Sequence, residues 1–345
     1  MNIFKTIIKN KDRLKKISDI IFPLISLMII LYFCIKNNNI SKLCEAFPNL
    51  NFLWIIVAIA SLILTLYFDG KCLKELFKYM NYRNFREIFF FKISFLGQYF
   101  TALTPMGIGS KAIQVLKFKE AGIPEHISIM ILTRKLMVYQ ICLTIISLIS
   151  GALYYSELFV IYPEFIVWFI VGIISQSFMV GLLFISLANK KFTLKISNFI
   201  IFMLNKLKVI KNYSRVNCSI NEKIETLITQ NKSFSKNKIF NLKIYALNFL
   251  QIIFTFLIPF FIFKSFNYQC LPILKSFCTQ SVITTISSFT PLPGASGTYE
   301  SSFLKFFSLL IPSTKIAAIM ILYRLISFYL ILIFGTIFYK KSTKH

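Results

Sequence analysis

The sequence predicts an all-α polytopic membrane protein, and three observations lead to this fold class. Of its 345 residues, 56% are hydrophobic and only 15% are charged, which is too apolar for a soluble domain. Several apolar runs are long enough to cross a hydrocarbon layer of about 30 Å, which takes about 20 helical residues. Two further apolar segments are interrupted by proline and glycine. We therefore expect about six spanning helices and two re-entrant helical hairpins in a single integral membrane domain, residues 1–345.

The spanning helices are expected wherever an apolar run reaches the necessary length. The first run follows the basic stretch KNKDRLKK and lacks a small-residue cleavage site, so we interpret it as a retained helix and not as a signal peptide. The six expected helices cover residues 18–35, 52–68, 127–149, 165–188, 244–263 and 315–339.

Lysine and arginine are distributed unevenly between the linkers, and this distribution orients the helices. The basic segments are the N-terminal stretch, 69–87, 189–243 and the C-terminal tail, and the linkers with few positive charges are 36–51, 150–164 and 264–271. Basic loops stay on the cytoplasmic side, so both termini are expected on that side. The membrane itself is expected to be the cytoplasmic (inner) membrane. The apolar pieces of 189–243 are too short to span, which predicts interfacial amphipathic helices and linker. Whether residues 196–210 enter the bilayer is left open.

Two apolar segments carry helix breakers near their centres. The segment FFFKISFLGQYFTALTPMGIGSK (89–111) contains a Thr-Pro pair at 104–105, and KSFCTQSVITTISSFTPLPGASGTYE (275–300) contains another at 290–291. Proline removes a backbone donor, and glycine permits turns that are closed to other residues. Such a tip survives in a membrane only where protein buries it or water reaches it. Both segments are therefore predicted to be re-entrant hairpins.

The two hairpins are followed by nearly identical hexapeptides, IMILTR (129–134) and IMILYR (319–324). The hexapeptides lie 190 residues apart and the Thr-Pro pairs 186 apart, which indicates a diverged internal repeat over 88–188 and 244–340. The orientation from charge gives the two copies opposite directions. In transporters, an inverted-topology repeat places the substrate site near the midplane, where the broken helices meet.

Each hexapeptide ends in an arginine, Arg134 or Arg324, inside an apolar run. Both side chains could simply reach the interface, but lysine would serve that purpose, and the chain has 33 lysines and six arginines. A planar, permanently charged guanidinium suits a phosphate or carboxylate, and a charge retained within a membrane is a functional hypothesis by default. We expect the two arginines to converge on one anion site near the midplane.

The hairpin tips are expected to complete this site, because backbone amides at glycine turns and helix starts suit phosphate. The glycines could instead serve only to make tight turns. Glu300 is expected either to pair with Arg324 when the site is empty or to lie at the interface. The candidate substrate-binding residues are Arg134, Arg324, Lys111, Lys135, Thr104, Gly107, Gly109, Ser110, Thr290, Gly294, Ser296, Gly297, Thr298 and Glu300.

The remaining composition argues against several other functions. The net charge of +26 is placed as in a positive-inside membrane protein, so we expect no nucleic-acid partner. Seven cysteines show no CxxC spacing, and His126 and His345 are the only histidines, so no metal site and no cofactor are expected.

The stretches FLGQYFTALTPMGIGSKAIQVLKF, FTPLPGASGTYESSF and ILYRLISFYLILIFG resemble the transmembrane domain of the lysylphosphatidylglycerol synthase/flippase family. The likeness covers roughly residues 15–340, without the C-terminal synthase domain of some members. It implies a multi-pass protein that moves an anionic or aminoacylated lipid between leaflets, and some relatives stand beside glycolipid or isoprenoid pathways. Met106 and Lys111 depart from a first turn that is often more glycine-rich and acidic in the family.

The sequence thus predicts a lipid translocator that is not an enzyme, with anionic or isoprenoid-linked membrane lipids as partners and a separate lipid-modifying enzyme as a further possible one. A small-anion carrier shares the repeat and the arginines, and a membrane glycosyl- or aminoacyl-transferase is the second alternative. No ATP-binding motif is present. The lipid, the direction, the energy coupling and the oligomeric state are not determined by the sequence.

Overall fold

The computed structural model describes residues 50–82, 85–104, 107–195, 198, 231, 237–268, 270–290, 292–311 and 315–342. All regular elements of this part of the chain are helical. They are α4 (Phe52–Tyr79), α5 (Glu87–Leu103), α6 (Ile108–Glu120), α7 (Glu125–Leu153), α8 (Tyr155–Leu158), α9 (Glu164–Ala188), α12 (Lys238–Ser265), α13 (Ile273–Ser287), η2 (Pro293–Ala295), α14 (Thr298–Ser308), α15 (Ile316–Arg324), the π-helix η4 (Leu325–Tyr329) and α16 (Leu330–Ser342).

Five helical stretches in the described residues are long and apolar enough to cross a membrane. They are Phe52–Tyr79, Glu125–Leu153, Glu164–Ala188, Lys238–Ser265 and Ile316–Tyr339. Each coincides with a predicted span, and the prediction of an all-α polytopic membrane fold is confirmed. The sixth predicted span, 18–35, lies outside the described residues, as does most of the segment 189–243.

The first described span is longer than predicted. The sequence suggests a helix over 52–68 and a basic loop from residue 69, but α4 continues to Tyr79. The extension is amphipathic, because Leu73, Leu76 and Phe77 follow helical spacing and are all buried. The lysines between them occupy the other face, so they do not end the helix. Asp69 therefore lies within the spanning helix and is itself buried.

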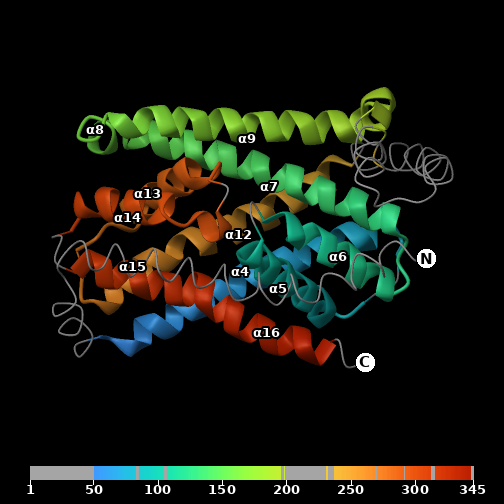
Figure 1. Cartoon of the computed structure of the whole chain (residues 1–345), viewed down its shortest axis with the longest axis horizontal. Helices are drawn as coiled ribbons and strands as arrows, with labels where there is room; N and C mark the ends of the chain where they lie inside the picture. The colour runs from blue at the N-terminus through green and yellow to red at the C-terminus, as the bar shows by residue number, and fades with distance from the viewer. Residues whose placement is uncertain are drawn as a thin grey trace.

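The two predicted hairpins are formed by α5 with α6 and by α13 with α14. They lie toward opposite ends of the bundle's long axis (Figure 1). Each arm is shorter than a span, at 17 and 13 residues in the first hairpin and 15 and 11 in the second. This arrangement is the one that the predicted inverted repeat requires, although descent from one repeated unit stays a prediction.

α4 and α12 run side by side through the centre of the bundle (Figure 1). Ser61 Oγ donates to the Phe254 carbonyl at 2.7 Å, and Thr65 Oγ1 lies 3.2 Å from Thr255 Oγ1. α7 and α9 form a second pair along one edge (Figure 1). The short polar side chains between α4 and α12 let these two helices approach closely in an apolar surrounding.

The buried apolar residues form two large clusters, one around each hairpin. The first hairpin packs through Phe90 and Phe118 against the end of α4 and the start of α7. The second packs through Phe303 and Phe307 against the end of α12 and α15. Each hairpin is therefore held in a core of its own.

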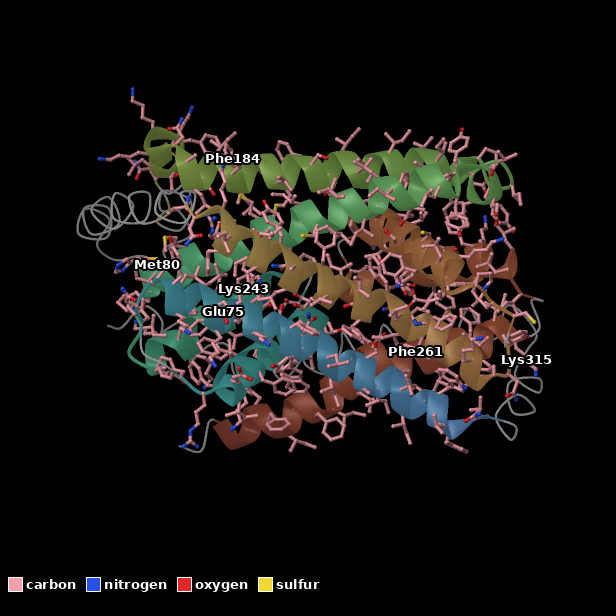
Figure 2. The ribbon with its side chains drawn as sticks, turned by 180° about the vertical axis from the view of Figure 1, so that it is seen from behind. Glu75, Met80, Phe184, Lys243, Phe261 and Lys315 are labelled. Carbon is pink, nitrogen blue, oxygen red and sulfur yellow. The ribbon has the colours of Figure 1, made fainter. Side chains whose placement is uncertain are left out.

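Lysines gather toward one end of the two central helices, at positions 71, 74 and 78 of α4 and 238 and 243 of α12. We call the end formed by the last turns of α4 and the first turns of α12 the basic end, and the other the far end. Glu75, Met80 and Lys243 lie at the basic end and Lys315 at the far end (Figure 2). Lys243 Nζ is 2.8 Å from Glu75 Oε2. By the positive-inside rule, the basic end is the one expected to face the cytoplasm.

Candidate functional site

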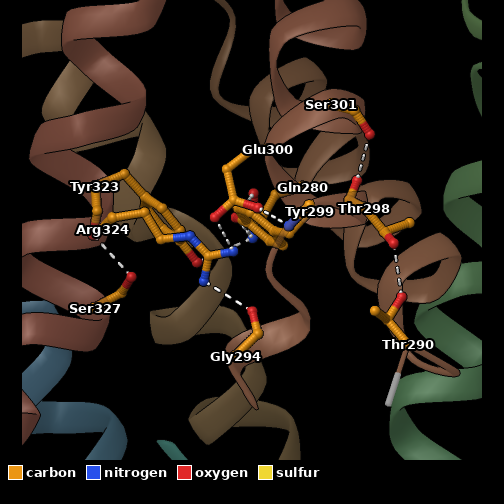
Figure 3. Close-up of polar contacts among 11 residues, drawn as sticks. Gln280, Thr290, Gly294, Thr298, Tyr299, Glu300, Ser301, Tyr323, Arg324 and Ser327 are labelled. Carbon is orange, nitrogen blue, oxygen red and sulfur yellow. Dashed lines mark hydrogen bonds and ion pairs between the residues drawn. The ribbon is translucent and has the colours of Figure 1, made fainter. Parts of the chain in front are cut away.

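A buried ion pair joins the second hairpin to the helix that follows it. The Arg324 guanidinium on α15 lies 2.7 Å from Glu300 Oε1 on α14, and its Nη1 donates to the Gly294 carbonyl at 2.9 Å. Figure 3 shows the carboxylate and the carbonyl facing the guanidinium from two sides. Glu300 is 0% exposed and Arg324 4% exposed. The prediction that Glu300 either pairs with Arg324 or lies at the interface is thus resolved in favour of pairing.

Aromatic and amide groups enclose this pair. Arg324 Cζ lies 4.3 Å from the centre of the Tyr299 ring, a cation–π contact. Behind it, Gln280 of α13 donates to the Tyr299 hydroxyl at 2.7 Å and to the Tyr323 hydroxyl at 3.3 Å (Figure 3). All three of these residues are buried. The charges therefore lie in a buried position beside aromatic and amide groups, where each partner depends on the other for stability.

The tip of the second hairpin has a backbone that few residue types adopt. Gly294 and Gly297 have φ of 62° and 93°, the region open to glycine. The Gly297 amide donates to Glu300 Oε2 at 2.5 Å, and Thr290 Oγ1 donates to Thr298 Oγ1 at 2.9 Å. The Gly297 amide and the hydroxyls of Thr290 and Thr298, which the sequence suggests for a phosphate, are therefore engaged within the tip. Glu300 links the tip amide to Arg324.

The helix after Arg324 is not a regular α-helix. Residues Leu325–Tyr329 form a π-helix between α15 and α16. A π-bulge widens one turn, and such bulges are frequent at functional sites. Phe328 of this turn lies against the tip, since a Cβ on Gly294 would be 2.6 Å from its ring. Arg324, the last residue of α15, and Phe328 of the widened turn therefore both lie against the second hairpin tip.

The first half contains a different buried pair. Lys135 Nζ of α7 forms an ion pair with Asp69 Oδ1 of α4, and both side chains are at most 10% exposed. Lys111 of α6 interacts electrostatically with both of them and lies 3.5 Å from Gln114 Oε1. This cluster of two ammonium groups and one carboxylate has a net charge of +1. It can therefore attract an anion without first losing its internal pair.

The tip of the first hairpin is closed by threonine. Thr104 Oγ1 donates to the Phe100 carbonyl at 2.7 Å and accepts from the Gly109 amide at 3.0 Å. Gly107 precedes α6 with a φ of 67°. Ser110 is buried against α5, where a Cβ on Gly97 would lie 3.2 Å from its hydroxyl. The Gly109 amide is therefore engaged within the protein in this structure.

Arg134 occupies a third location. Its Nη1 donates to Asn231 Oδ1 at 3.0 Å and its Nη2 to Asn241 Oδ1 at 2.8 Å, near the start of α12. By helical rise, Arg134 lies about 14 Å along α7 from the basic end, and Arg324 about 12 Å along α15 from the far end. The two guanidinium groups share neither of these sets of partners. The structure does not bring them to one site.

The candidate residues thus fall into separate groups. The second tip brings together Thr290, Gly294, Ser296, Gly297, Thr298, Glu300 and Arg324, whereas Thr104, Gly107, Gly109 and Ser110 form the first tip, Lys111 and Lys135 join Asp69, and Arg134 stands apart. Sequence analysis did not include Asp69, Gln280 or Tyr299 among the candidate substrate-binding residues. The acidic residue in the apolar run LILTLYFDG was a usable sequence signal for Asp69. No sequence pattern pointed to Gln280 or Tyr299.

A cavity of about 670 Å³ lies between α6 and α7. Lys111 lines it together with apolar residues such as Val115 and Leu132. Ala112 and Ile129 in its wall are exposed, so it opens at the surface of the bundle. Lys119 and Glu125 at its rim form an ion pair. The cavity therefore joins an apolar surface to Lys111, which is the member of the cluster with Lys135 and Asp69 that lines it.

Within the described residues, no group of three His, Cys, Asp or Glu side chains could hold a metal ion. No curated protein and no solved structure gave a significant match to the chain. The profile described as the lysylphosphatidylglycerol synthase TM region matches residues 20–335, nearly the whole sequence. The chain belongs to the lysylphosphatidylglycerol synthase TM region family.

Proposed function

We propose that this membrane protein translocates lipids, moving an anionic, aminoacylated or isoprenoid-linked head group between the leaflets of the cytoplasmic membrane. Both chain ends would face the cytoplasm, at the basic end. Family membership supports a role connected with membrane lipids. A separate enzyme that makes or modifies the lipid would supply the substrate.

The cavity between α6 and α7 is the observation that carries this proposal. Its wall is mostly apolar and partly exposed, whereas Lys111 gives it a cation beside the Lys135–Asp69 pair. A lipid needs both features, since its tails stay in hydrocarbon while its phosphate seeks a positive charge. A carrier for small anions would need a pathway closed to lipid, and the exposed Ile129 argues against that here.

Arg324 would receive the phosphate in the second half. The guanidinium is now held by Glu300 and by the Gly294 carbonyl. A phosphate that replaced the carboxylate would keep the buried charge of Arg324 compensated. Glu300 would then release the Gly297 amide, which is a donor that suits phosphate. The second tip would thus gain the negative charge of the phosphate, so the displaced Glu300 carboxylate would have to leave its buried position.

Reconstitution in vesicles tests the proposal directly. Fluorescent head groups on anionic and isoprenoid lipids should become accessible from the opposite face faster than in protein-free vesicles. Lys111→Gln should slow this crossing, whereas Lys71→Gln, at the basic end but outside the cavity, should not. Crossing no faster than in empty vesicles for every lipid class would refute translocation. A flux of entrapped phosphate without lipid crossing would indicate the anion carrier instead.

A further inference from the structure

A second and larger cavity lies on the other side of the first hairpin. Its volume is about 1010 Å³, and it is lined by residues of α4, α5, the end of α6 and α16. We call it the α5 groove. It shares only Glu120 with the cavity between α6 and α7. The first hairpin is therefore flanked by two separate spaces.

The walls of the α5 groove are apolar and accessible. Ile63 of α4 is 50% exposed, and Phe334 and Phe338 of α16 are 49% and 47% exposed. Phe338 packs edge-on against Phe95 of α5 at 5.4 Å between ring centres, which closes one side of the groove. On a membrane protein, an open apolar groove between helices is exposed to lipid chains. Its volume is at the upper end of the range typical of ligand pockets, roughly 300–1,000 Å³.

The end of the α5 groove toward the basic end is polar and positively charged. Lys92 of α5 is exposed, and Lys117 of α6 pairs with Glu120 at 2.7 Å. The three groups have a net charge of +1, which complements the single negative charge of a phosphodiester. Lys92 lies five residues from the start of α5, so its flexible side chain can place the ammonium at the level of the head groups.

We infer that the α5 groove holds an anionic phospholipid of the leaflet at the basic end, with its acyl chains between α4 and α16 and its phosphate between Lys92 and Lys117. The inference goes beyond the proposed function, because it concerns a lipid that binds at equilibrium, outside the cavity that contains Lys111. An apolar wall with a cationic end matches an amphiphile with an anionic head. A neutral head group would leave the cationic end without a counter-charge.

Tryptophan fluorescence with brominated lipids tests the inference. Trp54 and Trp168 are replaced by Phe, and one reporter is placed in the groove by Phe334→Trp. A second reporter, Phe178→Trp, faces lipid on α9, where Phe178 is 66% exposed. Quenching by bromine on the acyl chains should favour phosphatidylglycerol over phosphatidylcholine at position 334 and not at 178. Lys92→Gln and Lys117→Gln should each lower that preference about fivefold, whereas Lys71→Gln should leave it unchanged.

Three outcomes would overturn the inference. Equal quenching by the two lipids at position 334 would remove the anion preference. A preference that survives the loss of both lysines would place its origin elsewhere. Absence of quenching at 334 would mean that protein fills the groove, for instance the predicted helix 18–35. Phe338→Trp provides a second groove reporter if Phe334→Trp fails to fold. Because the measurement involves no crossing of head groups, it can succeed or fail independently of translocation.

Discussion

Asp69 and Lys135 form an ion pair between α4 and α7, at a depth where neither side chain is more than 10% exposed. The pair fixes the contact between the central helix pair and the helix that follows the first hairpin. Breaking one partner of a buried pair leaves an uncompensated charge, which costs more than the pair itself contributes. Substitution of either partner should therefore be a sensitive test of the stability of this half of the fold.

Asp69→Ala or Lys135→Ala alone should lower the free energy of unfolding by about 3–5 kcal/mol, because each leaves a buried charge. The double variant Asp69→Leu/Lys135→Met should recover most of that loss, since neither charge of the pair remains. Unfolding in mixed detergent micelles measures all three. If the double variant is as unstable as the single ones, the pair is not the source of the effect. Lys74→Ala is a control, because its pair with Glu87 lies at the surface.

The sequence predicted the positions of the helices better than it predicted which side chains pair with one another. Long apolar runs and paired Thr-Pro breaks were sufficient for five spans and both hairpins, because bilayer thickness imposes these lengths. The predicted end of α4 at residue 68 was wrong, because an amphipathic helix continues beyond the hydrophobic run. The two arginines looked equivalent in their hexapeptides, yet Arg324 meets Glu300 and Arg134 meets Asn241. Such pairing depends on segments far apart in the chain, which no local pattern encodes.

Gly172→Ala should destabilise the protein, because α9 approaches α13 at this glycine. A Cβ at position 172 would lie 2.4 Å from the Thr285 carbonyl oxygen, a backbone atom that cannot move alone. Overpacking of this kind costs about 1–3 kcal/mol. Gly181→Ala on the same helix is the matched control, since nothing lies within 4 Å of its Cβ. Helix propensity alone should make that variant more stable by up to about 1 kcal/mol. Equal effects at both positions in a thermal unfolding assay would contradict the close contact.

Glu300→Gln should make stability depend on anionic ligands. Without its carboxylate, Arg324 is a buried charge with no ionic partner, held by the Gly294 carbonyl and the Tyr299 ring, so unfolding in neutral detergent should become easier by about 3–5 kcal/mol. An anionic lipid that replaces the carboxylate should restore part of this, as any ligand of the native state does. Thermal unfolding with phosphatidylglycerol and with phosphatidylcholine measures the difference. The double variant Glu300→Gln/Arg324→Gln should lose that response, and a response that persists would exclude Arg324 as the phosphate ligand.

Arg134→Lys and Arg324→Lys should affect lipid crossing unequally, although their hexapeptides are alike. Arg324 faces a carboxylate and a carbonyl at once, and a lysine ammonium cannot reproduce that planar fork for a phosphate. Its replacement should reduce crossing in vesicles at least about tenfold, which corresponds to the loss of one charge-assisted hydrogen bond of about 1.5–3 kcal/mol. Arg134 donates to Asn231 and Asn241, so its replacement should mainly lower stability and leave crossing within about threefold by the same measure. Insertion and folding are checked by size-exclusion chromatography of each variant. Equal loss of crossing in two well-folded variants would restore the view that both arginines handle the head group.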